Sequence, residues 1–295
     1  MFDKLKSLLQ DPPPAMAFEI SEAGIAAARI GARAELDFQS LKPGTLTVSP
    51  IKENVADPDE FVAAVRSLAG TQAARKRKDV ALILPDYSAR IAVLDFDNFP
   101  KEPKEQAALI RFRLKRSVPF DVETAAMSYH AQPSAGGKMD AVVVMTPLEI
   151  LSRYEAPFRA AGLSPGLVTT SSMAALDLAP EAGLSVIAKL TGRVLTVLVR
   201  ENANLKLVRC LELPSSNLED IAAVLIPTFV YIEDNLGRRA ETLLLCGFGP
   251  QTDEAARRFA EELTVAVEPL RSPLGTPGEN NAGLLGYLRS IAKNN

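Results

Sequence analysis

Hydrophobic and polar positions follow the same order in two separate stretches of the chain. In the first stretch, three short apolar runs have the composition and spacing typical of β-strands. They cover Met16–Ile20, Gly24–Ile30 and Leu36–Val48, and the last is interrupted by Pro43 and Gly44. This pattern predicts a three-stranded meander near the start of the chain.

A helix and a fourth strand are predicted to follow the meander. Asp57 is a suitable N-cap, Pro58 suits the first turn, and Glu60 completes a capping box. Gly70 provides a residue that ends helices readily. The β-branched and apolar run Val80–Leu84 then predicts a strand.

The same order of elements returns in the second half of the chain. Three strands are predicted at Leu184–Leu190, Val194–Arg200 and Leu205–Leu213, followed by a helix between the cap Asn217 and Gly237. The remaining elements are predicted as the strand Thr242–Cys246, the helix Thr252–Leu263, the strand Val265–Glu268 and the helix Gly283–Ile291. The repeat lies in the order of elements, because the two halves share almost no sequence identity.

An insertion separates the halves, from about residue 86 to residue 168. Its pattern predicts a strand, a charged helix, two strands and a second helix, which is the content of a small α+β subdomain. The predicted elements are Ile91–Phe96, Glu102–Arg116, Ala126–Gln132, Met139–Met145 and a helix capped by Thr146 and Glu149.

Neither end of the chain predicts a membrane anchor. Residues 1–10 have apolar positions at helical spacing before Pro12, which suits either a small docking helix or a terminus that packs locally. The longest apolar stretch, Ile221–Ile232, is shorter than the roughly 20 residues that span a bilayer. We therefore expect a chain that does not cross a membrane by itself.

Composition excludes several classes of protein. The formal net charge of −3 argues against a general nucleic-acid binder, which needs an excess of basic residues. One histidine, His130, and two cysteines, Cys210 and Cys246, exclude a histidine-rich zinc site and a four-cysteine cluster. Free thiols fit a reducing cytoplasm. The basic residues gather in two runs, Arg75–Lys78 and Arg111–Arg116.

Two longer stretches resemble one known family. Phe99–Ala131 has a charged helix leading into the Pro119–Phe120 turn and a strand, and Val142–Leu167 has a strand, a helix and the turn Ala161–Pro165. Both resemble segments of PilM, the type IV pilus assembly protein of the actin-like ATPase superfamily. The terminal Gly283–Arg289 is similar to the "GLxxR" helix of that family.

The resemblance implies an α/β chain with the actin-like, ribonuclease H-like fold, pseudo-duplicated and carrying an inserted α+β subdomain. It divides the chain into a tail, a first subdomain, the insertion and a second subdomain: residues 1–14, 15–85 with 169–180, 86–168, and 181–295. Leu213 and Leu218 are separated by only four residues. The helical lid that the family carries at this point is therefore predicted to be reduced.

The residues at the family's phosphate-binding turns depart from its pattern. In the first turn Glu19, Ser21 and Ala26 stand where the family has Asp, Gly and Lys, and Glu22 adds a negative charge. In the second turn the acidic residue is replaced by Lys189, with Thr191 after it.

The adenosine loop departs as well, because Phe248 separates two glycines that the family places together. We therefore predict no ATP hydrolysis, no cofactor and no metal, with degenerate remnants at Glu19, Ser21, Lys189, Thr191, Gly247 and Gly249. The alternative is an ATP-binding ATPase or small-molecule kinase with unusual turns, in which Glu19 still serves as a metal ligand.

Other side chains offer little chemistry. His130 has no serine, cysteine or aspartate at a useful spacing. Asp86, Asp95 and Asp97 form a possible carboxylate cluster, but acidic residues at alternate strand positions are more typical of a solvated edge.

The resemblance implies a cytoplasmic adaptor of a type IV pilus or related machine, held at the inner membrane by its partner. In PilM, a groove between the first and inserted subdomains receives a short peptide of the inner-membrane protein PilN. A related possibility is the cytoplasmic domain of a type II secretion component, which shares the fold.

The helix of the insertion is predicted to contribute to partner binding. Its basic residues favour an acidic peptide or an anionic lipid, although a solvated helix face explains them equally well. The candidate partner-binding residues are Ile110, Arg111, Arg113, Leu114 and Phe120.

Overall fold

Three β-sheets organise the chain in a computed structural model that describes residues 13–30, 34–70 and 78–294. The predicted docking helix at residues 1–10 and most of the basic run at Arg75–Lys78 lie outside the described residues. The first sheet has the order β3-β2-β1-β4-β8. Its strands are β1 (Met16–Ser21), β2 (Gly24–Ile30), β3 (Ala34–Ser40), β4 (Lys78–Leu84) and β8 (Leu163–Thr170).

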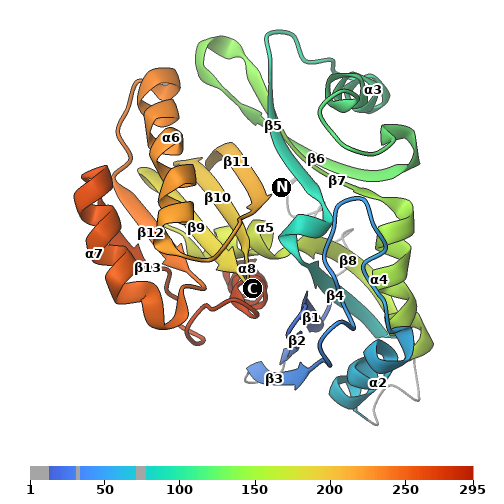
Figure 1. Cartoon of the computed structure of the whole chain (residues 1–295). Coiled ribbons are helices and arrows are strands. Elements are labelled where there is room, and N and C mark those ends of the chain that lie inside the picture. The colour runs from blue at the N-terminus through green and yellow to red at the C-terminus, as the bar shows by residue number, and fades with distance from the viewer. Residues whose placement is uncertain (1–12, 31–33, 71–77, 295) are drawn as a thin grey trace.

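Helices cover both faces of the first sheet (Figure 1). On one face α2 (Pro58–Ala69) and α4 (Leu148–Ala160) pack against large side chains of the sheet, and the rings of Phe18 in β1 and Phe158 in α4 meet edge to face. The other face is lined with alanines of β1, β2 and β4. Small side chains let α8 (Ala282–Asn294) approach the sheet closely on that face.

The second sheet repeats this plan. Its order is β11-β10-β9-β12-β13, with the antiparallel strands first and the parallel strands after them. The strands are β9 (Leu184–Thr191), β10 (Val194–Glu201), β11 (Asn204–Glu212), β12 (Thr242–Cys246) and β13 (Ala266–Pro269). Helices α6 (Leu218–Leu236) and α7 (Thr252–Leu263) cover one face (Figure 1).

The predicted meanders and caps of both halves are largely confirmed. The side chain of Asp57 accepts a hydrogen bond from the Glu60 amide at 3.0 Å at the start of α2. Asn217 accepts one from the Asp220 amide at 2.8 Å at the start of α6. Residues 213–217 join β11 directly to α6, so no helical unit lies between these two elements.

The inserted unit is smaller than the predicted range 86–168. It consists of a sheet of order β5-β7-β6, covered by α3. Its elements are β5 (Arg90–Phe96), α3 (Pro103–Leu114), β6 (Ala125–Pro133) and β7 (Met139–Pro147). The boundary was wrong because β8 pairs with β4 and α4 buries its apolar face against the first sheet.

One predicted cap is also corrected. Pro147 occupies the N-cap of α4, and no side chain there bonds the helix amides. Thr146 instead donates to the Ser88 carbonyl at 2.8 Å, because its side chain is buried beneath the turn that joins β4 to β5.

A short helix, α5 (Ser171–Ala175), and α8 occupy the space between the two large sheets. Apolar residues of α8 contact both halves: Leu284 lies with the first sheet and Leu285 with the second. Helix α8 therefore contributes to the apolar packing of both halves. In the described part of the chain, no helix is both long and apolar enough to span a membrane.

Candidate functional site at the junction of the two halves

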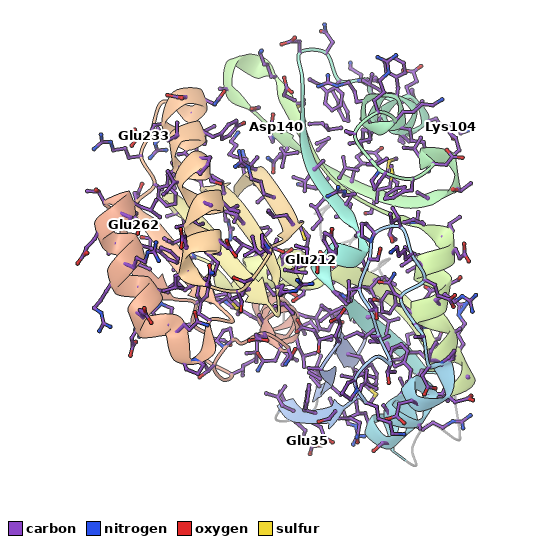
Figure 2. All side chains as sticks on the ribbon, in the orientation of Figure 1. Glu35, Lys104, Asp140, Glu212, Glu233 and Glu262 are labelled. Atoms are coloured by element: carbon purple, nitrogen blue, oxygen red, sulfur yellow. The ribbon has the colours of Figure 1, made fainter. Side chains whose placement is uncertain are left out.

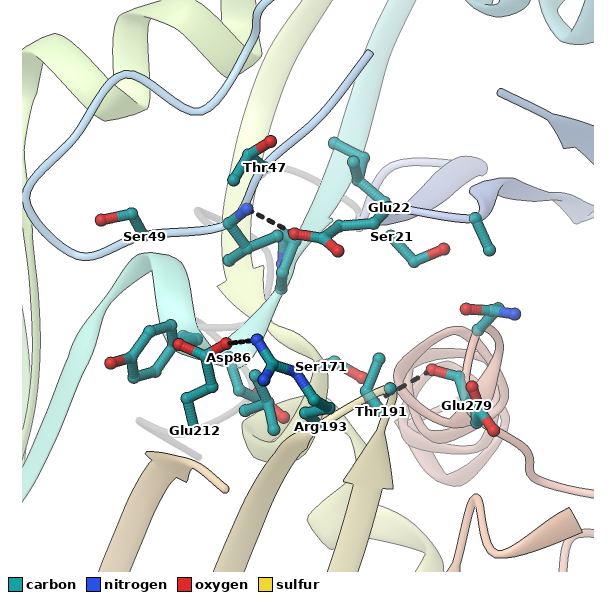
Figure 3. A pocket seen from close by; sticks show the side chains of 18 of the residues that line it. Ser21, Glu22, Thr47, Ser49, Asp86, Ser171, Thr191, Arg193, Glu212 and Glu279 are labelled. Carbon is teal, nitrogen blue, oxygen red and sulfur yellow. Dashed lines mark hydrogen bonds and ion pairs between the residues drawn. The ribbon is translucent and has the colours of Figure 1, made fainter. Parts of the chain in front are cut away.

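A cavity of about 680 Å³ opens where the two large sheets meet, at the ends of their central strands. Parallel strands present their carboxyl ends at one edge of a sheet, and ligand sites of α/β proteins form there. The β1–β2 turn and the 47–52 loop line one side of this cavity, and the β9–β10 turn lines the other. Figure 3 shows Ser21, Glu22 and Thr47 facing Thr191 and Arg193 across it.

A buried ion pair lies at the base of the cavity. The ammonium of Lys189, near the end of β9, lies 3.2 Å from a carboxylate oxygen of Asp86, just after β4. Both side chains are almost fully buried. Lys189 also donates to the Thr191 hydroxyl at 2.9 Å.

Asp86 has further partners that hold it in place. Its second carboxylate oxygen accepts a hydrogen bond from the Ser172 amide at 2.6 Å. The Thr196 hydroxyl donates to the first oxygen at 3.2 Å. The carboxylate therefore joins the first half to β9 and β10 of the second.

Glu19 of β1 is buried beside this pair. Its oxygens accept hydrogen bonds from the Ser171 hydroxyl and, at 2.7 Å, from the Leu284 amide at the start of α8. Burial raises the pKa of the Glu19 carboxyl, although the charge of Lys189 and these donors offset part of the effect. The carboxylate of Glu19 is thus committed to groups of the protein itself.

Lys189 is held in its charged form by its neighbours. Burial alone would lower the pKa of its ammonium, but the carboxylates of Asp86 and Glu19 outweigh burial and raise that pKa above its usual value. A permanent positive charge therefore lies between two carboxylates at the base of the cavity.

The first turn is closed by its own side chains. The Ser21 hydroxyl donates to the Gly24 carbonyl at 2.9 Å and accepts from the Gly24 amide at 3.2 Å. The carboxylate of Glu22 accepts from the Val48 amide at 2.7 Å, which fixes the 47–52 loop (Figure 3). The Gly24 amide is therefore occupied, and a carboxylate stands beside the turn.

The second turn presents an ion pair to the cavity. Arg193 pairs with Glu212 of β11, and the Thr191 hydroxyl is directed to the Glu279 carbonyl at 3.4 Å. The Arg193 guanidinium and the Thr191 hydroxyl are thus engaged within the chain. No group of three or more His, Cys, Asp or Glu side chains in the described ranges is arranged to hold a metal ion.

Four of the six predicted remnants meet at this cavity: Glu19, Ser21, Lys189 and Thr191 line it. Gly247 and Gly249 do not. Gly247 has φ +80° after β12, where a Cβ would overlap the Leu190 carbonyl oxygen. The first glycine is therefore required by the close approach of two strand ends.

Asp86 corrects the sequence-based interpretation. Asp95 and Asp97 are exposed, and they pair with Arg113 and Lys138. Asp86 was grouped with them as part of a solvated edge, but it is buried and paired with Lys189. Its position two residues after the apolar run Val80–Leu84 of a parallel strand is the available signal, because cleft residues occur there.

The predicted partner-binding residues lie in the inserted unit and away from the cavity. Ile110 and Leu114 are buried in the core of the unit, and Phe120 is half-buried against it. Arg111 donates to the carbonyls of Val122 and Ala125. Of the five, Arg113 is the most exposed, and it lies over the Phe96 ring at 5.3 Å. Binding by these residues remains a prediction.

The two cysteines are free thiols. Burial raises the pKa of Cys210 and of Cys246 to about 12, so both remain protonated near neutral pH. His130 lies exposed on β6. Neither residue type supplies a reactive group at the cavity.

Comparison with known proteins gives matches in structure alone. No family model matches the sequence, and no curated protein sequence is similar to it. A type IV pilus biogenesis complex of PilM and PilN superposes with a TM-score of 0.72 at 18% identity, covering 95% of this chain and 99% of the other.

Two further solved structures have the same overall arrangement. A Bacteroides thetaiotaomicron protein of actin-like ATPase fold has a TM-score of 0.58 at 12% identity, covering 98% of this chain and 99% of the other. The cytoplasmic domain of EpsL, an inner-membrane component of the Vibrio cholerae type II secretion system, has a TM-score of 0.54 at 14% identity, covering 95% and 94%. The chain therefore has the actin-like ATPase fold, with the resemblance to PilM that its sequence predicts.

Proposed function

We propose that this chain is a non-catalytic adaptor of a type IV pilus or related inner-membrane assembly machine. The observation that carries the proposal is the buried Lys189 at the base of the cavity. Actin-fold ATPases hold phosphates between two turns with the help of an acidic residue and a divalent cation. Lys189 is a resident cation in that cleft, and Asp86 and Glu19 are already bound to protein groups.

The groups around the cavity support the same conclusion. A phosphate needs free backbone amides and a positive environment. Ser21 closes the first turn, and Glu22 adds a negative charge beside it. Arg193, the cation of the second turn, is paired with Glu212.

The partner is proposed from the structural neighbours. One of them is a complex of PilM with PilN, and another is an inner-membrane component of a secretion system. We propose that a short peptide of a PilN-like inner-membrane protein binds this chain between the first half and the inserted unit. The 47–52 loop of the first half and Tyr87, which precedes the inserted unit, line the cavity, and Ile51 is 55% exposed.

Calorimetry with Mg-ATP tests the absence of nucleotide chemistry. We expect no heat of binding at millimolar nucleotide with the full chain. Micromolar binding of Mg-ATP to the unaltered chain would favour the alternative, an ATPase or kinase with unusual turns.

Co-purification with the cytoplasmic segment of the PilN-like protein from the same organism tests the adaptor role. We expect a stable complex, weakened by Ile51→Asp at the cavity and unaffected by Val230→Asp on α6, which is similarly exposed. Failure of the unaltered chain to retain that segment would remove the support for this partner.

A further inference from the structure

The outer surface of α3 carries an unusual pair of features that the adaptor role does not use. Phe112 is 76% exposed, the highest value among the large hydrophobic side chains of the described residues. Lys115 and Arg116 follow it at the end of the same helix and are also exposed. An exposed aromatic residue next to basic side chains is typical of surfaces that bind membranes.

Helical geometry sets the direction of Phe112. At 100° per residue, Phe112 lies about 160° from both Ile110 and Leu114, and Lys115 and Arg116 follow at the C-cap and in the turn after the helix. The buried residues Ile110 and Leu114 lie on the opposite face and fix α3 to the β-sheet of the inserted unit. Phe112 is therefore directed away from the protein by the same contacts that anchor the helix.

The basic side chains of this surface have no partner within the described residues. Lys101, Lys104, Lys115 and Arg116 make no hydrogen bond or ion pair there, whereas Arg111 and Arg113 are engaged with the inserted unit. Glu105, two turns before Phe112, is the one acidic residue within α3. Positive charge thus prevails around Phe112, at the outer edge of the molecule, where Figure 2 shows Lys104.

We infer that this surface of α3 binds the anionic headgroups of a lipid bilayer, with Phe112 inserted at the level of the headgroups. Each basic residue near an anionic membrane contributes about 1 kcal/mol, and an aromatic ring is favourable at the interface. A single projecting ring suits a soft lipid surface. An acidic protein partner would need a shaped apolar surface, and the cavity between the two halves does not involve α3.

The chain offers a direct spectroscopic test, because it contains no tryptophan. The variant Phe112→Trp, made in the full chain, places one fluorophore at the proposed contact. We expect its emission to shift to shorter wavelength with vesicles of phosphatidylcholine and phosphatidylglycerol, and not with phosphatidylcholine alone. An unchanged spectrum with the anionic vesicles would overturn the inference.

Vesicle sedimentation with the full chain measures the contribution of each group. The double variant Lys115→Glu/Arg116→Glu reverses two charges and is expected to weaken vesicle binding at least tenfold. The reason is that each basic residue near an anionic membrane contributes about 1 kcal/mol. Phe112→Ser is expected to weaken it several-fold. Binding of the unaltered chain should also weaken when the salt concentration rises.

Two matched variants control for charge and for apolar area. Arg257→Glu reverses an exposed arginine on α7, and Val230→Ser removes an exposed apolar side chain on α6. Both are expected to bind vesicles as the unaltered chain does. If the α3 variants bind vesicles as tightly as the unaltered chain, the lipid contact lies elsewhere and the inference is overturned.

The test is separate from that of the adaptor role. Retention of the PilN-like segment is expected to be the same in the α3 variants, because Phe112, Lys115 and Arg116 do not line the cavity. If the unaltered chain ignores anionic vesicles but binds a glutamate-rich peptide through Lys115 and Arg116, the surface belongs to an acidic protein partner and the lipid assignment is wrong.

Discussion

At the scale of single residues, Lys189 interacts with two carboxylates that come from the other half of the chain. Asp86 follows β4 and Glu19 lies on β1, so the three charges meet only when both sheets are formed and joined. A buried charge that loses its partner is costly, because water cannot solvate it. These residues thus couple the chemistry of the cleft to the stability of the whole chain.

Replacing the cation is expected to destabilise the protein strongly. Lys189→Met keeps the length of the side chain but leaves Asp86 and Glu19 buried without a positive charge, at a cost of about 3–5 kcal/mol. Denaturant unfolding measures this free energy. Arg238→Ala, which breaks only exposed ion pairs, should cost less than about 1 kcal/mol.

A double variant distinguishes lost charge from lost volume. Lys189→Met/Asp86→Asn removes one of the uncompensated negative charges, so it should recover part of the stability lost in Lys189→Met. A double variant less stable than the single one would contradict the assignment of the loss to unpaired charge.

Glu19 is expected to make stability depend on pH. Its pKa is raised in the folded protein above the ordinary value of 4.5, so the folded state holds its proton more tightly. The corresponding stability is complete below pH 4.5 and is lost as the pH rises through the folded pKa. Glu19→Gln cannot ionise and should gain stability relative to the unaltered chain over this range.

The measurement is the difference in free energy of unfolding between the two proteins at a series of pH values from 4 to 8. Other titrating groups affect both proteins alike and cancel in the difference. If the free energy of unfolding of Glu19→Gln minus that of the unaltered chain does not rise with pH, burial does not destabilise the charged form of Glu19.

At the scale of elements, α8 depends on two glycines that bring it against α5. A Cβ at Gly283 would lie 2.8 Å from Ile83 and from Ser171, and one at Gly286 would overlap the Ala174 carbonyl. The helix is thus close enough for the Leu284 amide to reach Glu19. The two glycines of this segment have their physical reason in this close contact.

Gly286→Ala is expected to destabilise the protein although alanine favours helices. The gain in helix propensity is about 1 kcal/mol, but the added methyl group would push α8 from α5, and overpacking costs about 1–3 kcal/mol. Thermal or denaturant unfolding measures the net loss. Gly278→Ala, where a Cβ would make only ordinary contacts, should be nearly neutral. If both variants lose the same stability, the close contact between α8 and α5 is not the reason for the loss in Gly286→Ala.

At the scale of the whole molecule, the inserted unit is fixed to the second half by polar contacts along β11. Gln132 of β6 exchanges two hydrogen bonds with the backbone of Leu205, at 2.7 and 3.2 Å. Lys206 pairs with Asp140 of β7 at 3.0 Å, largely buried. The inserted unit thus links the first half to the second beside the cavity.

Gln132→Ala is expected to loosen this junction without unfolding the chain. The buried backbone groups of Leu205 would lose their partners, at a cost of about 1–3 kcal/mol, and local opening should become easier. Hydrogen exchange should accelerate in β11 and β5 and remain unchanged in α7. The partly exposed Gln39→Ala on β3 is the control, and acceleration confined to β6 would contradict a shared junction.

The local pattern of the sequence determined most elements of both halves. Caps such as Asp57 and Asn217 act on residues that are close to them in the chain, and so do alternating apolar residues and turn glycines. Their effects can therefore be predicted from the sequence. The duplicated order and the short link between Leu213 and Leu218 likewise predicted a pseudo-duplicated fold with a reduced lid.

Only the tertiary structure decided which charges meet. Asp86 resembles a solvated acid in the sequence, but it follows a parallel strand whose carboxyl end adjoins the end of β9, so folding buries it against Lys189. The tertiary structure also decided that α4 and β8 belong with the first sheet. Their local sequence pattern shows that they have an apolar face, but it does not show which sheet that face packs against. Contacts between distant segments depend on how the sheets come together, and a pattern of neighbouring residues does not record that.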